Sequence, residues 1–430
     1  MEKNPRFTVI IPAKNRATYL FHTLRTCSMQ EYENLEIIVS DDGSTDDTRE
    51  VVESAGRRDG RVRYISPGLG VGMRDNFEFA LNQVKPGYVI ALGADDGLLP
   101  RGIQGMHDLL KETGKDLAAW PAPTFSYANS RTIDSQLVLF RKSGRKIIRS
   151  ADFLKRQAEA LDYLDDIESP MSYVKGVAST VLIDRVRSRS LDGRFYACPT
   201  PDGYSGIVLA GEVEDYAFSG EPFSIYGISP TSQGMNYQAG TSEATIISEA
   251  FFRAVSNAPM HARLASQPYS PLIALMTADY IFTASDLPGW PGRFPPIDFQ
   301  HLLTRGLNEL SHGLYAKERL VRELKILGSI ADANGLTEFF RQKVKTTNRF
   351  LEKDRFAGNG ISPNFFVLSG ADIGVSNIVD AAYFAHFAHS MFSRPMIATA
   401  ADAIRNSISY WLRSRVKGEA FPDESVWRKN

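Results

Sequence analysis

Two apolar runs in the N-terminal part of the chain each end abruptly in a pair of aspartates followed by glycine. They read LEIIVSDDGSTDDT over residues 35–48 and YVIALGADDGLLP over residues 88–100. Runs rich in β-branched and apolar residues are typical of strands that are buried on both faces. An open α/β sheet binds its ligands just beyond the C-terminal ends of such strands. The two runs therefore predict a ligand site that suits a nucleotide and a divalent cation.

The N-terminal part alternates short apolar runs with amphipathic stretches. Strands are expected over residues 6–12, 35–40, 61–66 and 88–92, and helices over 17–29, 46–55, 72–84 and 101–113, with Ser44 or Thr45 capping the second helix. This β-α-β-α order predicts an α/β fold with a parallel, doubly wound sheet. From about residue 122 to 240, short strands such as 178–183 mix with turns and a helix near 150–161.

After about residue 240 the pattern becomes mainly helical. The expected helices are 242–257, 269–285, 298–311, 314–332, 335–353, 378–392 and 395–416. We therefore expect two domains, a nucleotide-binding domain over residues 1–240 and a helical domain over residues 241–430. The helical domain would bind an acceptor, form a homo-oligomer or contact a membrane surface.

Composition narrows the class of protein. A net charge of −1 gives no indication of nucleic-acid binding. The two cysteines, Cys27 and Cys198, lie in no metal or disulfide pattern. The N-terminus does not read as a signal peptide, and no apolar stretch is long enough to span a bilayer. We expect a cytoplasmic protein, with peripheral attachment to the inner face of the membrane as a further option.

Several segments in the right order resemble one family. The run IIPAKN, the run DDGSTDDT and the later segment GMRDNFEFAL…GYVIALGADDGLLP are similar to family-two inverting glycosyltransferases with the GT-A fold. The resemblance covers residues 6 to about 235. It implies a Rossmann-like, mostly parallel sheet and transfer of a sugar from a nucleotide-diphospho-sugar, with UDP as the favoured nucleotide. The implied acceptor is a hydroxyl of a glycan or a lipid-linked molecule, in surface polysaccharide synthesis.

The resemblance also assigns residues to the donor. Asp41 and Asp42 precede Gly43, which allows a sharp turn, and a carboxylate can accept the imide N–H of uracil. The family's base-contacting aspartate matches Asp42. Further donor-binding positions are predicted at the end of the first strand and the start of the third helix, namely Pro12, Lys14, Asn15, Arg74 and Asn76.

Asp95 and Asp96 are the candidate metal ligands. Mg²⁺ and Mn²⁺ prefer oxygen ligands and bridge the phosphates of nucleotides. The family pattern is Asp-x-Asp-Asp, and this chain has Gly93 at its first position, so one acid is missing. Asp95 is also expected to contact the donor. A metal-assisted reaction therefore remains the prediction, with one carboxylate fewer than the pattern.

The reaction needs a group that removes the proton of the acceptor hydroxyl. The segment CPTPDGYSGIVLA, residues 198–210, resembles the family position where an aspartate opens a helix, so Asp202 is the predicted base. The nearby acids Glu212, Glu214 and Asp215 are the alternative. Stacking of a sugar on aromatic rings is expected at Tyr204, Trp120 or Tyr127, and residues 229–240 are expected to form a loop over the donor.

The sequence of the helical half contains no pattern that indicates catalytic or ligand-binding residues. Residues 404–417 hold four basic residues and no acidic one, which favours either a packing or dimerisation helix or a helix on anionic lipid. Two rival functions stay open. One is a nucleotidylyltransferase, which would need a glycine-rich first loop. The other is a catalytically inactive nucleotide-sugar-binding scaffold, which the missing acid at Gly93 favours.

Overall fold

The computed structural model of the 430-residue chain describes residues 4–68, 70–128, 134–141, 144–232, 237, 251, 259–312, 315–350, 359–392 and 418–420. Its first unit is an eight-stranded sheet in the order β3-β2-β1-β4-β10-β6-β11-β9. The strands are β1 (Phe7–Ala13), β2 (Leu35–Asp41), β3 (Val62–Ile65), β4 (Tyr88–Ala91), β6 (Leu117–Ala119), β9 (Arg145–Arg149), β10 (Gly176–Ser179) and β11 (Asp215–Ser219). The predicted α/β class is confirmed.

The first four strands in this order are parallel, as the sequence pattern predicts. β10 runs antiparallel to both β4 and β6, and β9 runs antiparallel to β11. The sheet is therefore mixed beyond β4. The prediction of a strand over 178–183 is wrong: β10 ends at Ser179, whose hydroxyl accepts the N–H of Leu182 and caps α6 (Thr180–Arg189).

Helices cover both faces of this sheet. Side chains of a strand alternate between its two faces, and both sets are apolar here, so each face needs a helical cover. Phe7, Val9 and Ile11 pack with α1 (Ala17–Ser28), α2 (Thr48–Arg58) and α4 (Gly102–Thr113). Ile10 of the same strand points into the opposite cluster, with α3 (Met73–Leu81), α5 (Ser150–Ala160), α6 and α7 (Pro201–Gly211). The sheet is thus buried on both faces.

The predicted cap of α2 is wrong. The helix begins after Asp47, and neither Ser44 nor Thr45 caps it. Both are bound to Asn15 of the preceding loop instead: Asn15 N–H donates to Ser44 Oγ at 2.8 Å, and Thr45 N–H donates to Asn15 Oδ1 at 2.8 Å. A tertiary contact therefore displaces the local cap.

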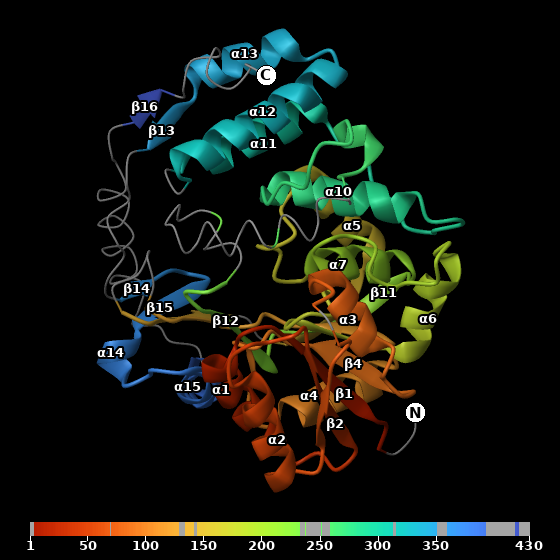
Figure 1. Ribbon diagram of the computed structural model, residues 1–430, viewed down its shortest axis with the longest axis vertical. Helices are drawn as coiled ribbons and strands as arrows, with labels where there is room; N and C mark the ends of the chain where they lie inside the picture. Colours follow the sequence, from red (N-terminus) through yellow and green to blue (C-terminus); the bar gives the residue numbers. More distant parts are fainter. Residues whose placement is uncertain are drawn as a thin grey trace.

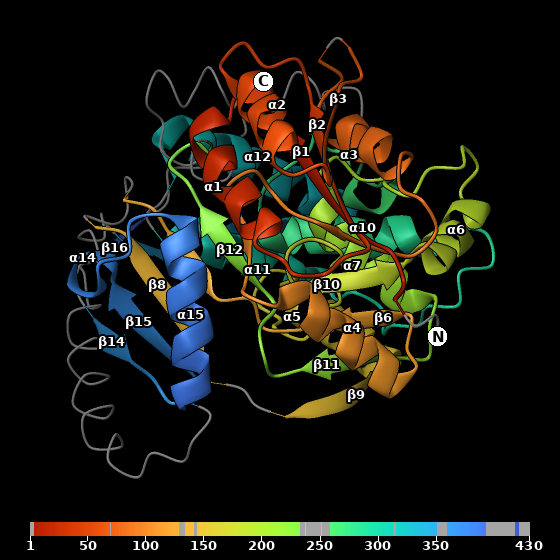
Figure 2. The ribbon, with the colours of Figure 1, turned by 90° about the horizontal axis from the view of Figure 1, so that it is seen from below.

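A second, six-stranded sheet has the order β14-β15-β8-β7-β12-β5. Its strands are β5 (Gly97–Leu98), β7 (Thr124–Ser126), β8 (Gln136–Phe140), β12 (Ser224–Ile228), β14 (Gly360–Ile361) and β15 (Phe365–Ser369). Buried residues of α15 (Ile378–Phe392) pack on this sheet, as Figure 2 shows. Residues 360–392 therefore return to the N-terminal part of the chain.

A helical layer lies at one end of the molecule (Figure 1) and consists of α10 (Ile273–Ser285), α11 (Phe299–Ser311), α12 (Lys317–Ala333) and α13 (Thr337–Thr346). The other described elements are a short 3-10 helix at 262–264, a small sheet of β13 (Asn348–Phe350) and β16 (Gly418–Ala420), and α14 (Gly370–Ile373), which lies beside β15 away from this layer. α10 shares the core of α7. The predicted helix 395–416 and the segment 404–417 lie outside the described residues, and so does the predicted helix 242–257 apart from residue 251. Most of the chain around the predicted boundary at 240 is not described either.

Candidate active site

Asp42 follows β2 directly, and its carboxylate is buried, with 3% of the residue exposed. Oδ1 accepts the N–H of Val71, and Oδ2 accepts the N–H of Gly72 at 3.2 Å. Lys14, from the loop after β1, lies 3.2 Å from Oδ2 and forms an ion pair with it. A Cβ on Gly70 would lie 2.9 Å from Lys14 Nζ, so the glycine leaves room for the lysine. Asp42 therefore joins three loops at the sheet edge.

Asp41 and Asn15 hold the same loops from the other side. Asp41 Oδ1 accepts the N–H of Ser44 at 3.0 Å, and its Oδ2 accepts the hydroxyl of Tyr64 at 2.9 Å. Asn15 has a φ of +52°, a left-handed conformation that asparagine adopts more readily than most residues. Pro12 lies within β1, opposite Ser40 of β2. The residues predicted at this edge are therefore together, and Asp41 is occupied by loop contacts.

Arg74 and Asn76 lie in the first turns of α3. Asn76 is 2% exposed; its Oδ1 accepts the hydroxyl of Ser40 at 2.6 Å, and its Nδ2 donates to Ser40 O at 3.0 Å. In this structure Asn76 thus ties α3 to the end of β2. Arg74 is half-buried and pairs with Asp75, which also accepts from Arg194 at 2.7 Å.

The second pair of aspartates follows β4. Asp96 is fully buried; its Oδ2 accepts the N–H of Gly93 at 2.6 Å, and its Oδ1 accepts the N–H of Gly227 in β12 at 2.7 Å. Asp95 is half-buried, and its Oδ2 accepts the N–H of Ser229 at 3.3 Å. Burial, with a smaller contribution from Asp95, raises the pKa of Asp96 to about 8.

The two carboxylates fit one divalent cation. Measured from the position of a Cβ on Gly93, Asp96 Oδ2 is 2.9 Å away and Asp95 Oδ1 is 3.1 Å away, so the two oxygens converge. Within the described ranges, no cluster of three or more His, Cys, Asp or Glu residues is arranged to hold a metal. Mg²⁺ is often bound by one or two carboxylates together with substrate phosphates. Asp95 and Asp96 match that donor set.

Asp202 lies in the first turn of α7, directly after Pro201, which suits the start of a helix. The hydroxyl of Tyr163 donates to its Oδ2 at 3.4 Å. Its Oδ1 is shielded from solvent and has no well-formed hydrogen bond in the described part of the chain. Burial raises the pKa of Asp202, against the opposing effect of the N–H of Gly203 and of Tyr163. A carboxylate with one oxygen uncommitted can accept a proton.

The alternative acids have other partners. Glu212 is buried and forms an ion pair with Arg189. Asp215 begins β11 and forms an ion pair with Lys115, and Glu214 is exposed beside it. Two of these acids are thus held in ion pairs and the third is exposed, whereas Oδ1 of Asp202 is buried with no hydrogen-bond partner in the described part of the chain.

Two tyrosines lie near both Asp202 and the two acids that follow β4, Asp95 and Asp96 (the β4 acids). Asp95, Asp96 and Asp202 are all close enough to Tyr173 and to Tyr226 to raise the pKa of each phenol, after the larger effect of burial. The two rings are 6.2 Å apart, edge to face. Ser172, beside Tyr173, is bound both to Ala91 of β4 and to Ser205 of α7, so this segment joins the end of β4 to the helix of Asp202.

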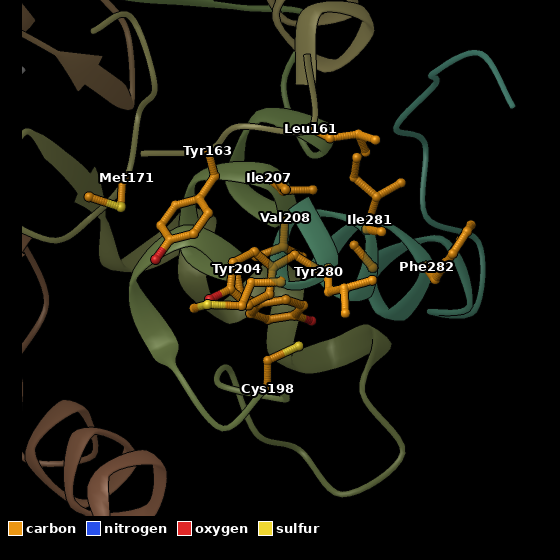
Figure 3. Close-up of a cluster of buried hydrophobic side chains, with 14 of the residues drawn as sticks. Leu161, Tyr163, Met171, Cys198, Tyr204, Ile207, Val208, Tyr280, Ile281 and Phe282 are labelled. Carbon is orange, nitrogen blue, oxygen red and sulfur yellow. The ribbon is translucent and has the colours of Figure 1, made fainter. Parts of the chain in front are cut away.

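The aromatic residues expected to stack on a sugar have different surroundings. Tyr204 is 1% exposed and lies in the core with Tyr280 and Cys198 (Figure 3). Trp120 is fully buried and donates its indole N–H to Ser224 Oγ at 2.7 Å. The prediction that these two residues stack on a sugar is therefore wrong. Tyr127 does line a cavity of about 560 Å³.

The sequence reasoning missed three features of the site. These are the Tyr173 hydroxyl, the N–H groups of Gly227 in β12 and of Ser229 just after it, and the contact between Arg16 and Thr231 O at 2.7 Å. Each of these contacts joins segments that are far apart in the chain, so no local sequence pattern predicts it. Of the loop expected at 229–240, residues 229–232 and 237 are described.

Part of the chain is similar in sequence to known proteins. The α/β sheet with acids at its strand ends is a nucleotide-binding arrangement. Residues 8–168 match the sequence model of glycosyl transferase family 2. Residues 8–168 therefore carry a glycosyltransferase family 2 domain, which confirms the predicted resemblance over this part of the chain.

Individual relatives align with parts of the chain. A GalNAc(5)-diNAcBac-PP-undecaprenol beta-1,3-glucosyltransferase of Campylobacter jejuni is 36% identical over 96 residues, 22% of this chain and 31% of the relative. A chondroitin synthase of Escherichia coli is 30% identical over 137 residues, 32% of this chain and 19% of the relative. The chain thus spans about a third or less of the length of these relatives.

Solved structures align over more of the chain at lower identity. S. aureus TarS 1–349 in complex with UDP is 16% identical, covers 81% of this chain and 95% of its own, and has a TM-score of 0.43. A mannosyltransferase of Pyrobaculum calidifontis in complex with GDP-Man and Mn²⁺ covers 66% of this chain and 87% of its own, at 15% identity and a TM-score of 0.36. The family assignment rests on the sequence match.

Proposed function

We propose that this protein transfers a sugar, with inversion, from a nucleotide-diphospho-sugar to a hydroxyl of a glycan or lipid-linked acceptor. The observation that carries the proposal is that Asp95 and Asp96 lie beside the Tyr173 hydroxyl, while the neighbouring Ser172 is bound to α7, the helix of Asp202. That site lies beside the sheet edge where Asp42 meets Lys14.

The donor would lie across the ends of β1, β2 and β4. Asp42 would accept an imide N–H from the base, which favours uracil and hence a UDP-sugar. Lys14 and Arg74 are cations near this edge and would face the phosphates, with Pro12 and Asn15 shaping the loop. Asn76 would act through Ser40 by holding α3 against β2.

Asp95 and Asp96 would hold Mn²⁺ or Mg²⁺ together with the donor diphosphate. When bound, such a cation neutralises negative charge on the leaving diphosphate. Asp202 would accept the proton of the acceptor hydroxyl as its oxygen attacks the anomeric carbon from the side opposite the diphosphate. The raised pKa of Asp202 suits this task, since a stronger base takes the proton more readily.

The proposal also covers the partners of the protein and its location in the cell. We propose that the acceptor binds on the side of α7 and of the helical unit after residue 240. We expect the reaction to serve surface polysaccharide assembly, and we expect no nucleic-acid partner. No helix in the described residues is long and apolar enough to cross a membrane. A cytoplasmic protein, attached peripherally to the inner face of the membrane, fits a lipid-linked acceptor. A homo-oligomer through the helical unit is a further proposal.

A ligand panel tests the donor part. We would measure the melting temperature with nucleotide diphosphates and their sugars, with and without Mn²⁺, for the wild type and for Asp95→Ala. A ligand that binds only the folded state adds about 2.7 kcal/mol of stability at a concentration of a hundred times Kd, and this raises the melting temperature. We expect one nucleotide to give a Mn²⁺-dependent rise that Asp95→Ala abolishes. No rise with any nucleotide would contradict the proposal.

A further inference from the structure

The space beside the two β4 carboxylates is filled by a side chain from another segment. A Cβ on Gly93 would lie 2.5 Å from the hydroxyl of Tyr173, closer than any real Cβ contact, and the next nearest atoms are the carboxylate oxygens of Asp96 and Asp95. No side chain fits at position 93 while the Tyr173 hydroxyl keeps its place. The hydroxyl thus takes the room that an acid at this position would need.

The same hydroxyl lies beside the buried acid. Around position 93 the Tyr173 hydroxyl and Oδ2 of Asp96 are the two nearest atoms, at 2.5 and 2.9 Å from a Cβ on Gly93. Two main-chain N–H groups, those of Gly93 and Gly227, donate to Asp96. The Tyr173 hydroxyl is the nearest side-chain group on the side of Gly93, and it restricts how that carboxylate can turn.

The backbone around Tyr173 is fixed from two sides. Ala91 N–H donates to Ser172 O at 3.1 Å, and Val174 N–H donates to Ala91 O at 2.9 Å, so the segment is bound to the end of β4. Ser172 N–H donates to Ser205 Oγ at 3.1 Å, which binds the segment to α7, the helix of Asp202. The hydroxyl thus has a position that two elements of the site determine.

Val174 shows that this position costs conformational energy. Its φ is +58°, a region that β-branched residues rarely adopt. Strained residues persist where the surrounding structure over-determines them, and they gather at functional sites. The ring of Tyr173 is enclosed as well, 6.2 Å from the rings of Phe77 and Tyr226.

We infer that Tyr173 is a positioning residue of the cation site: its hydroxyl stands in place of the acid absent at Gly93 and orients Asp96 toward a divalent cation. The inference rests on the proposed function. A neutral hydroxyl replaces a carboxylate here, so two acids, Asp95 and Asp96, would supply the protein's charge to the cation and the donor diphosphate would supply further oxygen ligands.

The first test is Mn²⁺ binding in the presence of UDP, read from the electron paramagnetic resonance signal of free Mn²⁺. Loss of a group that orients a metal ligand weakens metal binding by roughly 10–100-fold. We expect Tyr173→Phe, which removes the hydroxyl alone, to weaken Mn²⁺ binding by about tenfold or more. Tyr196→Phe is the matched control, because Tyr196 packs edge-on against the same Phe77 ring at 5.6 Å, and it should bind Mn²⁺ as the wild type does.

The second test needs no ligand. Gly93→Ala should lower the melting temperature in the wild type, because the new methyl group meets the hydroxyl, and it should lower it less in a Tyr173→Phe background. An equal loss in both backgrounds would show that the hydroxyl does not occupy this space, and would overturn the inference.

The outcomes separate the inference from the proposed function. Wild-type Mn²⁺ binding that Tyr173→Phe leaves unchanged would overturn the inference and leave the proposed function standing. Absence of Mn²⁺ binding by the wild type with any nucleotide diphosphate would overturn both.

Discussion

At the scale of single residues, the site depends on glycines that let main-chain groups approach the acids. Gly227 in β12 donates its N–H to Asp96 and lies against the backbone of Asp95: a Cβ at position 227 would be 1.8 Å from Asp95 O. Gly93 admits the Tyr173 hydroxyl in the same way. These contacts set where the two carboxylates lie before any ligand binds.

Gly227→Ala is therefore predicted to disturb the acids directly. The methyl group cannot fit without moving β12 away from Asp95, and such overpacking costs about 1–3 kcal/mol. We expect a lower melting temperature and the loss of Mn²⁺-dependent nucleotide binding. Gly360→Ala is the matched control in the same sheet, because its Cβ would meet Val367 only at an ordinary 3.7 Å. Normal nucleotide binding by Gly227→Ala would contradict this account of the site.

At the scale of elements, local patterns identified β1, β2 and β4 because each is a buried apolar run ending in polar residues. The start of α7 was also predictable, since Pro201 and Asp202 suit a helix N-terminus. The strand prediction over residues 178–183 was wrong because Thr180, Val181 and Ile183 favour strands, whereas the cap at Ser179 starts a helix. The place of Tyr173 depends on pairing between distant segments, which no local pattern contains.

The helical layer has its own charged contact at the start of α10. Glu309 of α11 accepts the N–H groups of Ile273 and Ala274 at 2.7 and 2.9 Å. Burial raises the pKa of Glu309 to about 7 from 4.5 in the unfolded chain. The folded state therefore binds more protons than the unfolded state between these values, and stability falls as pH rises from about 4.5 to 7.

Glu309→Gln should remove this pH dependence, because an amide oxygen still accepts a hydrogen bond but carries no charge. The wild type should lose on the order of 3 kcal/mol of unfolding free energy between pH 5 and pH 8 through this group, since one pKa unit corresponds to about 1.4 kcal/mol. The variant should not show this loss. Melting temperatures at both pH values measure it. The exposed Glu318→Gln in α12 is the control; a Glu309→Gln profile parallel to that of the wild type would refute the assignment.

At the scale of the whole molecule, the sheet edge, the second sheet and α7 converge on one site. β12 and β5 bring Gly227 to the β4 acids, and the segment before β10 joins these acids to α7. The helical layer packs on α7 through α10. This arrangement puts the proposed donor and the proposed base on neighbouring elements, as a single-displacement transfer requires.

The most direct test of the account is turnover of the donor that the ligand panel identifies. Release of nucleoside diphosphate should be measured for the wild type, Asp202→Asn and Glu214→Gln, an exposed acid beyond the end of the same helix. Loss of a general base costs roughly 10²–10⁴-fold in rate. We predict a loss of that size in Asp202→Asn with unchanged donor binding, and a normal rate in Glu214→Gln. A wild type that binds the donor yet never releases nucleoside diphosphate would contradict the account and indicate a nucleotide-sugar-binding scaffold.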